Sequence, residues 1–168
     1  MLKLKKMAEG RMKFKARLVA LGCGQREGVD YLETFAPVAK GGTIRLLLAL
    51  AQLLGLHVHQ MDVDTAFLYV KLKEEIYMYP PEGMEGIPEG KVLKLMKSLY
   101  GLKQSPMNFN NTINEFIESM GFKRCVSDHC LYVRRNGRDI MLLVLYVDDI
   151  VIAGSDLAEV ERVEADFI

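Results

Sequence analysis

Residues 140–154 constrain the fold more than any other stretch, because two apolar runs meet there around a pair of acidic residues. Residues 140–147 are apolar or aromatic, Asp148 and Asp149 follow, and a second apolar run leads to Gly154. Runs that are apolar on both faces predict strands buried on both sides, so we expect a tight hairpin with two carboxylates at its tip. An ionised carboxylate is costly to bury unpaired, so the tip must meet water or cations. A structural alternative stays open, since Asp is common in turns for conformational reasons alone.

A third carboxylate, Asp62, comes near the end of another short extended segment, residues 57–63. If this strand lies beside the hairpin, Asp62 meets Asp148 and Asp149 at one edge of a sheet. Clustered carboxylates repel one another, and divalent cations relieve that repulsion. Two Mg²⁺ ions about 3.5–4 Å apart are the usual device for in-line phosphoryl transfer. The pattern therefore predicts a site for phosphoryl-transfer chemistry.

Six blocks of sequence, in a fixed order, carry a family resemblance. They are residues 15–20, 33–38, 60–63 with 66–68, 75–78 with 81–83, 98–106, and the Tyr-Val-Asp-Asp block at 146–149. With these residues the chain resembles, over nearly its whole length, the reverse transcriptase domain of copia-type long-terminal-repeat retrotransposon polyproteins. The resemblance implies an RNA-directed DNA polymerase, a nucleotidyltransferase that joins deoxynucleoside triphosphates to a primer 3′-hydroxyl.

Under this resemblance the three aspartates are the catalytic residues and the metal ligands. Asp62 and Asp148 are expected to bind both of two Mg²⁺ ions, for which Mn²⁺ is a substitute. Asp149 matches the second aspartate of the family's pair, and Val63 is expected to add a backbone carbonyl. The metals lower the pKa of the primer hydroxyl and neutralise charge on the triphosphate. The implied partners are an RNA or DNA template with its primer, and deoxynucleoside triphosphates.

The resemblance also implies a nucleotide-binding set, namely Lys15, Arg17, Ala66, Phe67, Tyr100 and Gly101. A guanidinium binds phosphate oxygens in a fork, which suits Arg17 for the triphosphate. The ring of Phe67 is expected to collide with a ribose 2′-hydroxyl and so to select deoxynucleotides, with an ordinary core position as the alternative. Gly101 permits a close approach of backbone in the block that lines the nucleotide pocket.

The order of expected strands and helices predicts an α+β fold, with an antiparallel sheet that carries the carboxylates and helices on one face. We expect a basic hairpin of residues 2–7 and 12–21 that turns at Glu9-Gly10, and further strands at 57–63, 75–79, 91–95, 131–133 and from 140. A first helix is expected to be capped by Thr43 and to run to Leu54, and a final helix is expected to be capped by Ser155. Between them, a helix from Ser105 is expected to carry an apolar stripe at Phe109, Ile113, Phe116, Ile117 and Met120. The resemblance names the sheet as the palm of a right-hand polymerase and the hairpin as part of the fingers. We expect one domain, residues 1–168, that lacks the thumb, connection and ribonuclease H, and the protease and integrase of the parent polyprotein.

Composition excludes some classes of protein. Half of the 168 residues are apolar, which favours a folded chain, and three cysteines suit a reducing compartment. A zinc site at Cys125, His129 and Cys130 is disfavoured, because no second ligand pair follows at regular spacing. The longest apolar stretch, residues 46–56, is too short for a membrane span. We therefore expect an intracellular protein without a membrane partner. The family resemblance implies the cytoplasm, or virus-like particles if the chain is part of an intact element.

Charge is unevenly distributed although the formal net charge is zero. Residues 1–28 carry eight Lys and Arg against two Glu, and residues 139–168 carry eight Asp and Glu against one Arg. A basic end suits phosphates and an acidic end suits cations, although an ordinary solvated surface is an equal alternative. The hairpin lysines likewise have an alternative role, as charges that keep an edge strand from aggregating.

Two segments depart from the family pattern. Met107-Asn108-Phe109 stands where the family usually has a basic residue, Gln and Trp, and Tyr69-Val70-Lys71 replaces a small, Gly-containing turn. A second hypothesis therefore stays open, in which the chain is a catalytically inactive remnant: a nucleic-acid-binding module or a genomic fragment without function. We expect the isolated chain to fold but to extend primers poorly or not at all, because duplex binding needs several phosphate contacts acting together.

Overall fold

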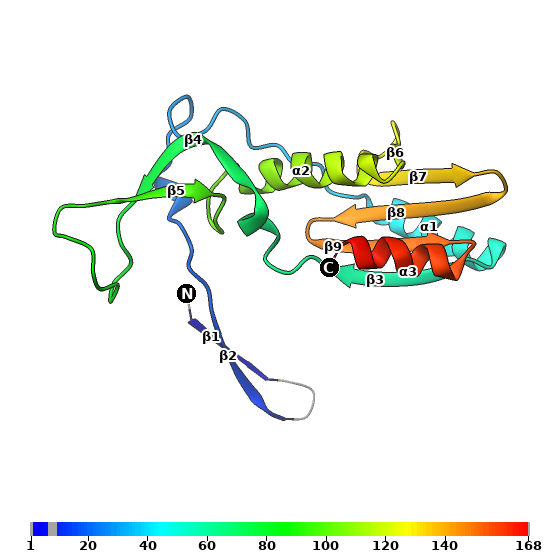
Figure 1. Cartoon of the computed structure of the whole chain (residues 1–168), viewed down its shortest axis with the longest axis horizontal. Helices are drawn as coiled ribbons and strands as arrows, with labels where there is room; N and C mark the ends of the chain where they lie inside the picture. The colour runs from blue at the N-terminus through cyan, green and yellow to red at the C-terminus, as the bar shows by residue number, and fades with distance from the viewer. Residues whose placement is uncertain (1, 7–9, 168) are drawn as a thin grey trace. The chain divides into compact units, whose positions relative to one another are not determined.

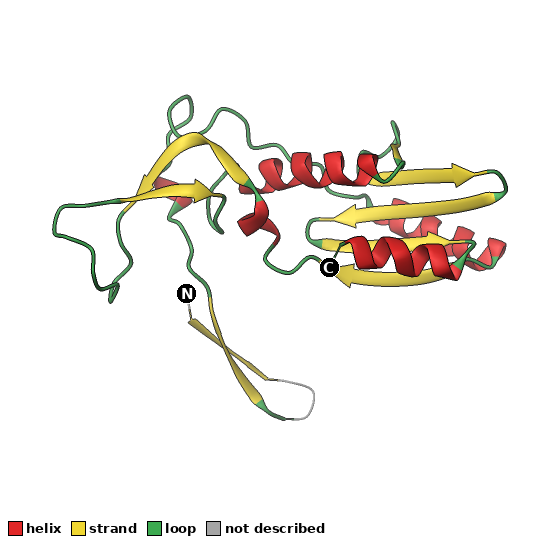
Figure 2. Cartoon of the chain, in the orientation of Figure 1, coloured by secondary structure: helices red, strands yellow, loops and turns green. Residues whose placement is uncertain are grey.

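The computed structural model describes residues 2–6 and 10–167, and the chain forms two compact units (Figure 1). Unit 1 comprises Met1–Phe35 and Phe67–Phe109, and unit 2 comprises Ala36–Ala66 and Asn110–Ile168. Each unit is thus built from two separate segments of sequence. The described residues contain three α-helices and only antiparallel sheets, which confirms the expected α+β class (Figure 2).

Unit 1 contains two β-hairpins. Their strands are β1 (Leu2–Lys6) with β2 (Met12–Ala16), and β4 (Lys71–Met78) with β5 (Leu93–Lys97). Alternation of apolar and basic residues correctly predicts the first hairpin, but β2 ends at Ala16 instead of Leu21. Met7 and Glu9, expected at the end of the first strand and in the turn, lie outside the described residues.

The apolar core of unit 1 lies against the second hairpin. Its buried residues are Ala20, Ile76, Leu99 and Leu102. Strand β2 of the first hairpin does not contribute to this core, because all of its residues are exposed and Phe14 is 85% exposed. Alternation in the basic hairpin therefore separates basic from apolar residues without burying the apolar ones.

Unit 2 is built on a five-stranded antiparallel sheet. The strands, in spatial order, are β3 (His57–Asp62), β9 (Asp149–Gly154), β8 (Asp139–Tyr146), β7 (Leu131–Asn136) and β6 (Lys123–Arg124). Strand β8 lies in the centre, and all residues from Met141 to Leu145 are buried. A central strand that is apolar on both faces needs cover on both faces.

Helices cover both faces of this sheet, so the expectation of helices on one face is wrong. Leu47 and Ala51 of α1 (Gly41–Leu54) form a core with Leu142, Val144 and Ala153. The opposite face, which carries Met141 and Gly154, contacts Val160 of α3 (Leu157–Asp166). Figure 1 shows α3 in front of the strands and α1 behind them. Hydrophobic periodicity does not predict which face of the sheet each helix covers, because α1 is apolar almost all round and α3 carries a single apolar stripe.

Helix α1 begins differently from the prediction. Its N-cap is Lys40, whose side chain forms no capping bond, and not Thr43. The carboxylate of Asp128 takes over this function. It accepts hydrogen bonds from the Lys40 N–H (3.1 Å) and the Thr43 hydroxyl (2.5 Å), both near the start of the helix. A cap supplied by a distant residue leaves no local sequence signal.

The other two helices largely follow their sequence signals. Helix α2 (Ser105–Ser119) starts at the expected serine, and its Ile113 and Ile117 are buried, whereas Phe116 is 38% exposed. Helix α3 is capped by Asp156, which accepts from the Ala158 N–H, and not by Ser155. In the part of the chain that the structure describes, no helix is long and apolar enough to cross a membrane.

Candidate active site

The backbone of unit 2 brings the three candidate catalytic aspartates to one end of neighbouring strands. Asp62, the last residue of β3, is the direct cross-strand partner of Asp149, the first residue of β9. Cα atoms of such partners lie about 4.5–5.5 Å apart. The N–H of Val63 donates to the carbonyl of Asp148 at 2.9 Å, which ties the residue after β3 to the hairpin turn. Gln60 donates to a carboxylate oxygen of Asp149 at 3.4 Å.

The turn that carries Asp148 has an unfavourable backbone conformation. Tyr146 pairs with Asp149, so Val147 and Asp148 alone form the turn, and Val147 has a φ of 60°. Asp148 has no positive φ, which gives the II′ pattern, whose first position normally holds glycine. A β-branched residue there is strained by about 1–3 kcal/mol. Val147 is 42% exposed, so burial of its side chain does not explain this strain.

The oxygen donors at this end suit hard divalent cations. Carboxylate and carbonyl oxygens are the ligands that Mg²⁺ and Mn²⁺ prefer. Within residues 2–6 and 10–167, no three His, Cys, Asp or Glu side chains are gathered closely enough to hold a metal ion. Like-charged carboxylates repel one another, which favours separated side chains. The backbone placement and the donor chemistry fit a cation site, and the side chains lie further apart than ligands of one ion.

The candidate nucleotide-binding residues of unit 1 are mostly in contact with one another. The guanidinium of Arg17 lies over the ring of Tyr100, 5.5 Å from its centroid. The ring of Phe67 meets that of Tyr100 edge-on, with centroids 5.0 Å apart and an interplanar angle of 65°. Lys15 is an exposed residue of β2 that lies opposite Lys3 of β1. Ala66 belongs to unit 2 and begins the short 3₁₀ helix η2 (Ala66–Tyr69).

Comparison with known protein families shows which family carries these aspartates and nucleotide-binding candidates. The profile described as "Reverse transcriptase (RNA-dependent DNA polymerase)" matches residues 1–167. The chain belongs to the reverse transcriptase family. This reverse transcriptase domain is of the copia type, a nucleotidyltransferase by family, and such enzymes use divalent metal ions and act on a primed nucleic acid with nucleoside triphosphates.

Relatives are retrotransposon polyproteins. The domain is 44% identical, over 98% of its length, to the retrovirus-related Pol polyprotein from transposon TNT 1-94 of Nicotiana tabacum, and covers 13% of that protein. It is 42% identical to the polyprotein from transposon RE1 of Arabidopsis thaliana, over 86% of this chain and 10% of that protein. It is 32% identical to the Gag-Pol polyprotein of transposon Ty1-ER2 of Saccharomyces cerevisiae, over 85% and 8% respectively. The chain thus spans about a tenth of the length of these relatives. No solved structure matches it.

Gly101, which we predict to permit a close backbone approach in the nucleotide pocket, lies against the backbone of Ala20. It has a φ of 94°, and a Cβ added there would lie 2.1 Å from the carbonyl oxygen of Ala20. The Ala20 N–H donates to the Tyr100 carbonyl at 2.7 Å. The approach observed is thus to the chain's own backbone, and it fixes Tyr100 beside the segment that carries Arg17.

A buried polar network in the reverse transcriptase domain was missed at the sequence level. Gln104 is fully buried, accepts from Gln25 at 3.0 Å and donates to the carbonyl of Asp30 at 2.9 Å. Gln25 also accepts from the Lys103 N–H at 2.8 Å, and the Lys103 ammonium lies 4.9 Å from the ring centroid of Tyr31. These bonds hold residues 25–31 against the 98–106 block. The one sequence signal for these bonds is the polar Gln104 within the 98–106 block.

Asp128 is a second residue that the sequence did not single out. Burial raises its pKa, but hydrogen bonds from Thr43, Cys130 and Lys40 outweigh burial and bring the pKa below its ordinary value. Its neighbour Cys130 is 1% exposed, and burial followed by the charge of Asp128 raises the pKa of this thiol to about 11. Both residues therefore contribute to the packing and hydrogen bonding of unit 2.

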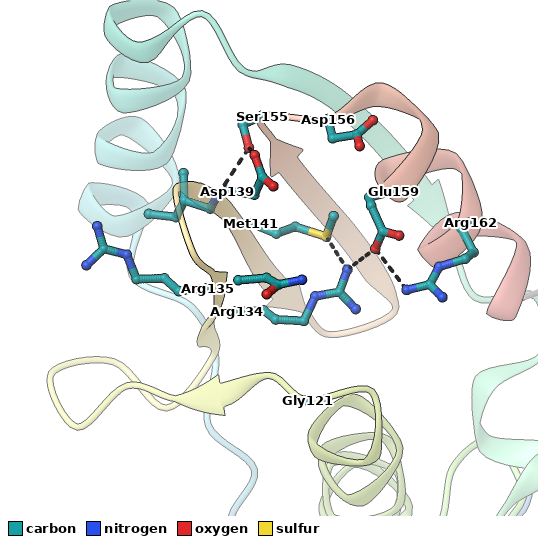
Figure 3. Close-up of a pocket in the computed structure, with 11 residues that line it drawn as sticks. Gly121, Arg134, Arg135, Asp139, Met141, Ser155, Asp156, Glu159 and Arg162 are labelled. Carbon is teal, nitrogen blue, oxygen red and sulfur yellow. Dashed lines mark hydrogen bonds and ion pairs between the residues drawn. The ribbon is translucent and has the colours of Figure 1, made fainter.

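A pocket of about 490 Å³ lies at the opposite end of β8 from the aspartate turn (Figure 3). Its walls include the end of β7, the start of β8, the residues that follow β9 and the first half of α3. Glu159 accepts from Arg134 and from Arg162, each at 2.8 Å. Ser155 donates to Asp139 at 3.3 Å. Charges in this pocket compensate one another, so it contrasts with the acidic end of the same sheet.

Proposed function

We propose that this domain is an RNA-directed DNA polymerase whose chemistry takes place at the Val147–Asp148 turn of unit 2. The observation that carries the proposal is the pairing of Asp62 with Asp149, together with the 2.9 Å bond from the Val63 N–H to the Asp148 carbonyl. Three carboxylates at the ends of adjacent strands are what a two-cation phosphoryl-transfer site requires.

Each residue has a distinct task in this proposal. Asp62, Asp148 and Asp149 would hold the Mg²⁺ or Mn²⁺ ions through their carboxylates, with Asp62 and Asp148 as the ligands shared by both ions, and Val63 would add its backbone carbonyl. When bound, the cations lower the pKa of the primer 3′-hydroxyl and neutralise charge on the triphosphate. The strained turn holds Asp148 at the tip in one conformation, so that no binding energy is spent on ordering it.

The residues of unit 1 bind the incoming nucleotide in this proposal. Arg17, oriented by the ring of Tyr100, and Lys15 bind the triphosphate through charge-assisted hydrogen bonds. Phe67 excludes the ribose 2′-hydroxyl, and Gly101 lines the nucleotide site of unit 1. Ala66 is a candidate nucleotide-binding residue of unit 2. We assign the sheet of unit 2 to the palm of a right-hand polymerase and the β1–β2 hairpin to the fingers.

Primer extension by the full chain tests this function. We expect Mg²⁺- or Mn²⁺-dependent addition of one or a few deoxynucleotides to a primer annealed to RNA or DNA. Asp148→Asn should reduce addition by at least about 100-fold, because several kcal/mol of transition-state stabilisation come from the cations. Asp139→Asn is the matched control, since Asp139 begins the strand that Asp148 follows. No addition by the wild-type chain, or equal addition by both variants, contradicts the proposal and favours the inactive remnant.

A further inference from the structure

Phe67 is held between two aromatic rings of unit 1. Besides Tyr100, it meets Phe109, with centroids 5.9 Å apart and an interplanar angle of 82°. Both contacts have the edge-to-face geometry that aromatic pairs prefer, each stabilised by about 0.5–1.5 kcal/mol beyond burial. The three rings come from η2, from the turn before α2 and from α2 itself. Phe109 lies in one of the two segments that depart from the family pattern.

The two neighbours of Phe67 differ in what else they contact. Tyr100 also carries Arg17 at 5.5 Å, so a change at Tyr100 disturbs sugar and phosphate binding together. Among the described residues, the aromatic ring that Phe109 contacts is that of Phe67. Phe109 therefore bears on the position of the Phe67 ring through a direct ring contact.

Resting on the proposed function, we propose that Phe109 is a positioning residue for Phe67 and sets how strongly the domain prefers deoxyribonucleotides. A ring excludes a 2′-hydroxyl only if it cannot turn away from the sugar. Core packing leaves few voids, so the ring of Phe109 occupies the space into which Phe67 would retreat. A smaller side chain at 109 opens that space, and the site then admits ribonucleotides while deoxynucleotides bind as before.

The inference predicts a gain of binding, which a merely structural role for Phe109 does not produce. A variant that loosens the fold loses affinity for dATP and ATP alike. Loss of Phe67 positioning instead tightens ATP binding and leaves dATP binding unchanged. We expect Phe109→Leu to lower the ratio of dATP to ATP affinity by roughly 3- to 10-fold, and Phe109→Trp, which keeps an aromatic ring, to stay within about twofold of wild type.

The test is competition of dATP and ATP against a base-labelled fluorescent dATP. The full chain is assembled with Mg²⁺ and a dideoxy-terminated primer on its template, so that affinity is measured without turnover. Phe116→Leu is the matched control, because Phe116 lies on the same helix and makes an equivalent edge-on contact with Phe167 (5.1 Å, 82°). Phe67→Ala and the double variant Phe67→Ala/Phe109→Leu complete a cycle, in which Phe109→Leu should have no effect once Phe67 is removed.

The outcomes separate the inference from the proposed function. If Phe67→Ala raises ATP affinity and Phe109→Leu does not, or if Phe109→Leu weakens both nucleotides equally, the inference is overturned and the proposed function stands. If the wild-type chain binds neither nucleotide, or Phe67→Ala leaves discrimination unchanged, the proposed role of Phe67 fails and the inference fails with it.

Discussion

The two turns that flank β8 have the same length, and the first residue of each has nearly the same positive φ. That residue is a glycine in one turn and a valine in the other. Gly137 begins the β7–β8 turn with a φ of 61°, and Val147 begins the β8–β9 turn with a φ of 60°. Glycine adopts this conformation without steric cost, whereas a β-branched residue does not. The glycine turn is the one that favours stability.

The charges around the two turns also differ, and again the Gly137 end is the one that favours stability. At the Gly137 end, Arg134, Glu159 and Arg162 compensate one another, and Asp139 accepts a hydrogen bond from Ser155. At the Val147 end, Asp148 takes part in no ion pair among the described residues, and three aspartates are brought together by the backbone. One end of the sheet is therefore built for stability. The other retains strain and like charges, the combination found where function competes with stability.

The largest effect on stability is expected at the compensated end. Arg134 donates to the Met120 carbonyl at 3.1 Å and to Glu159, and its side chain is 18% exposed. Arg134→Ala should lower the free energy of unfolding by about 2–3 kcal/mol, because charged hydrogen bonds and stem packing are lost together. Arg162→Ala, with a side chain 63% exposed, should cost at most about 0.5 kcal/mol. Urea unfolding measures both, and equal losses would contradict the account of this end.

Moving the valine to the other turn should reproduce the strain there. Gly137→Val should destabilise the domain by about 2 kcal/mol, because it places a β-branched residue at positive φ. A Cβ at Gly137 has no atom within 4 Å, so a steric clash with neighbours does not contribute. Equilibrium unfolding checks the value. A loss below about 0.5 kcal/mol would show that the two turns do not differ in strain.

Asp128 sharpens the comparison, because it is a carboxylate with a purely structural role. Asp128→Asn should lower the free energy of unfolding by about 1–2 kcal/mol at pH 7, since hydrogen bonds to a charged acceptor are weakened. Its folded pKa is lowered, so the contribution is present above the unfolded value of about 3.9 and is lost as pH falls through the folded pKa. Unfolding curves of wild type and variant should thus converge at acid pH. A difference that grows as pH falls would refute this sign.

A small effect of the opposite sign is expected from relieving the strain at the aspartate turn. Val147→Gly should stabilise the domain by at most about 1 kcal/mol, because relief of strain exceeds the entropy cost of glycine in the unfolded chain. Primer extension by this variant should nevertheless fall, since the turn orders Asp148 less well. Thermal unfolding and extension assays on the same preparation check both signs. A Val147→Gly variant that is less stable would remove the contrast between the turns.

Much of unit 2 could be predicted from local patterns. The apolar runs on either side of Asp148 and Asp149 correctly predict β8 and β9, because a strand buried on both faces needs apolar residues at every position. The register that places Asp62 opposite Asp149 agrees with the prediction that the carboxylates meet at one edge of the sheet. The positive φ of Val147 had no signal, since valine argues against that conformation.

The features that were missed depend on contacts between distant residues. Thr43 was predicted to cap α1, but Asp128 supplies the bonds from another loop. Which face of the sheet each helix covers depends on packing that periodicity does not encode. The contact of Phe67 with Phe109 likewise joins residues from separate elements. The strands and the carboxylates at their ends could therefore be predicted from local sequence patterns. The helix cap and the aromatic contacts could not, because they depend on tertiary packing.

The difference between the two ends of β8 is tested most directly by Mn²⁺ titration of the ¹⁵N-labelled chain, because the paramagnetic ion broadens the amide signals of nearby residues. The account predicts broadening at Val63, Val147 and Asp149, none at Gly137 and Asp139, and loss of the effect in Asp148→Asn. Broadening that is equal at both turns, or that survives Asp148→Asn, would contradict a cation site at the strained turn.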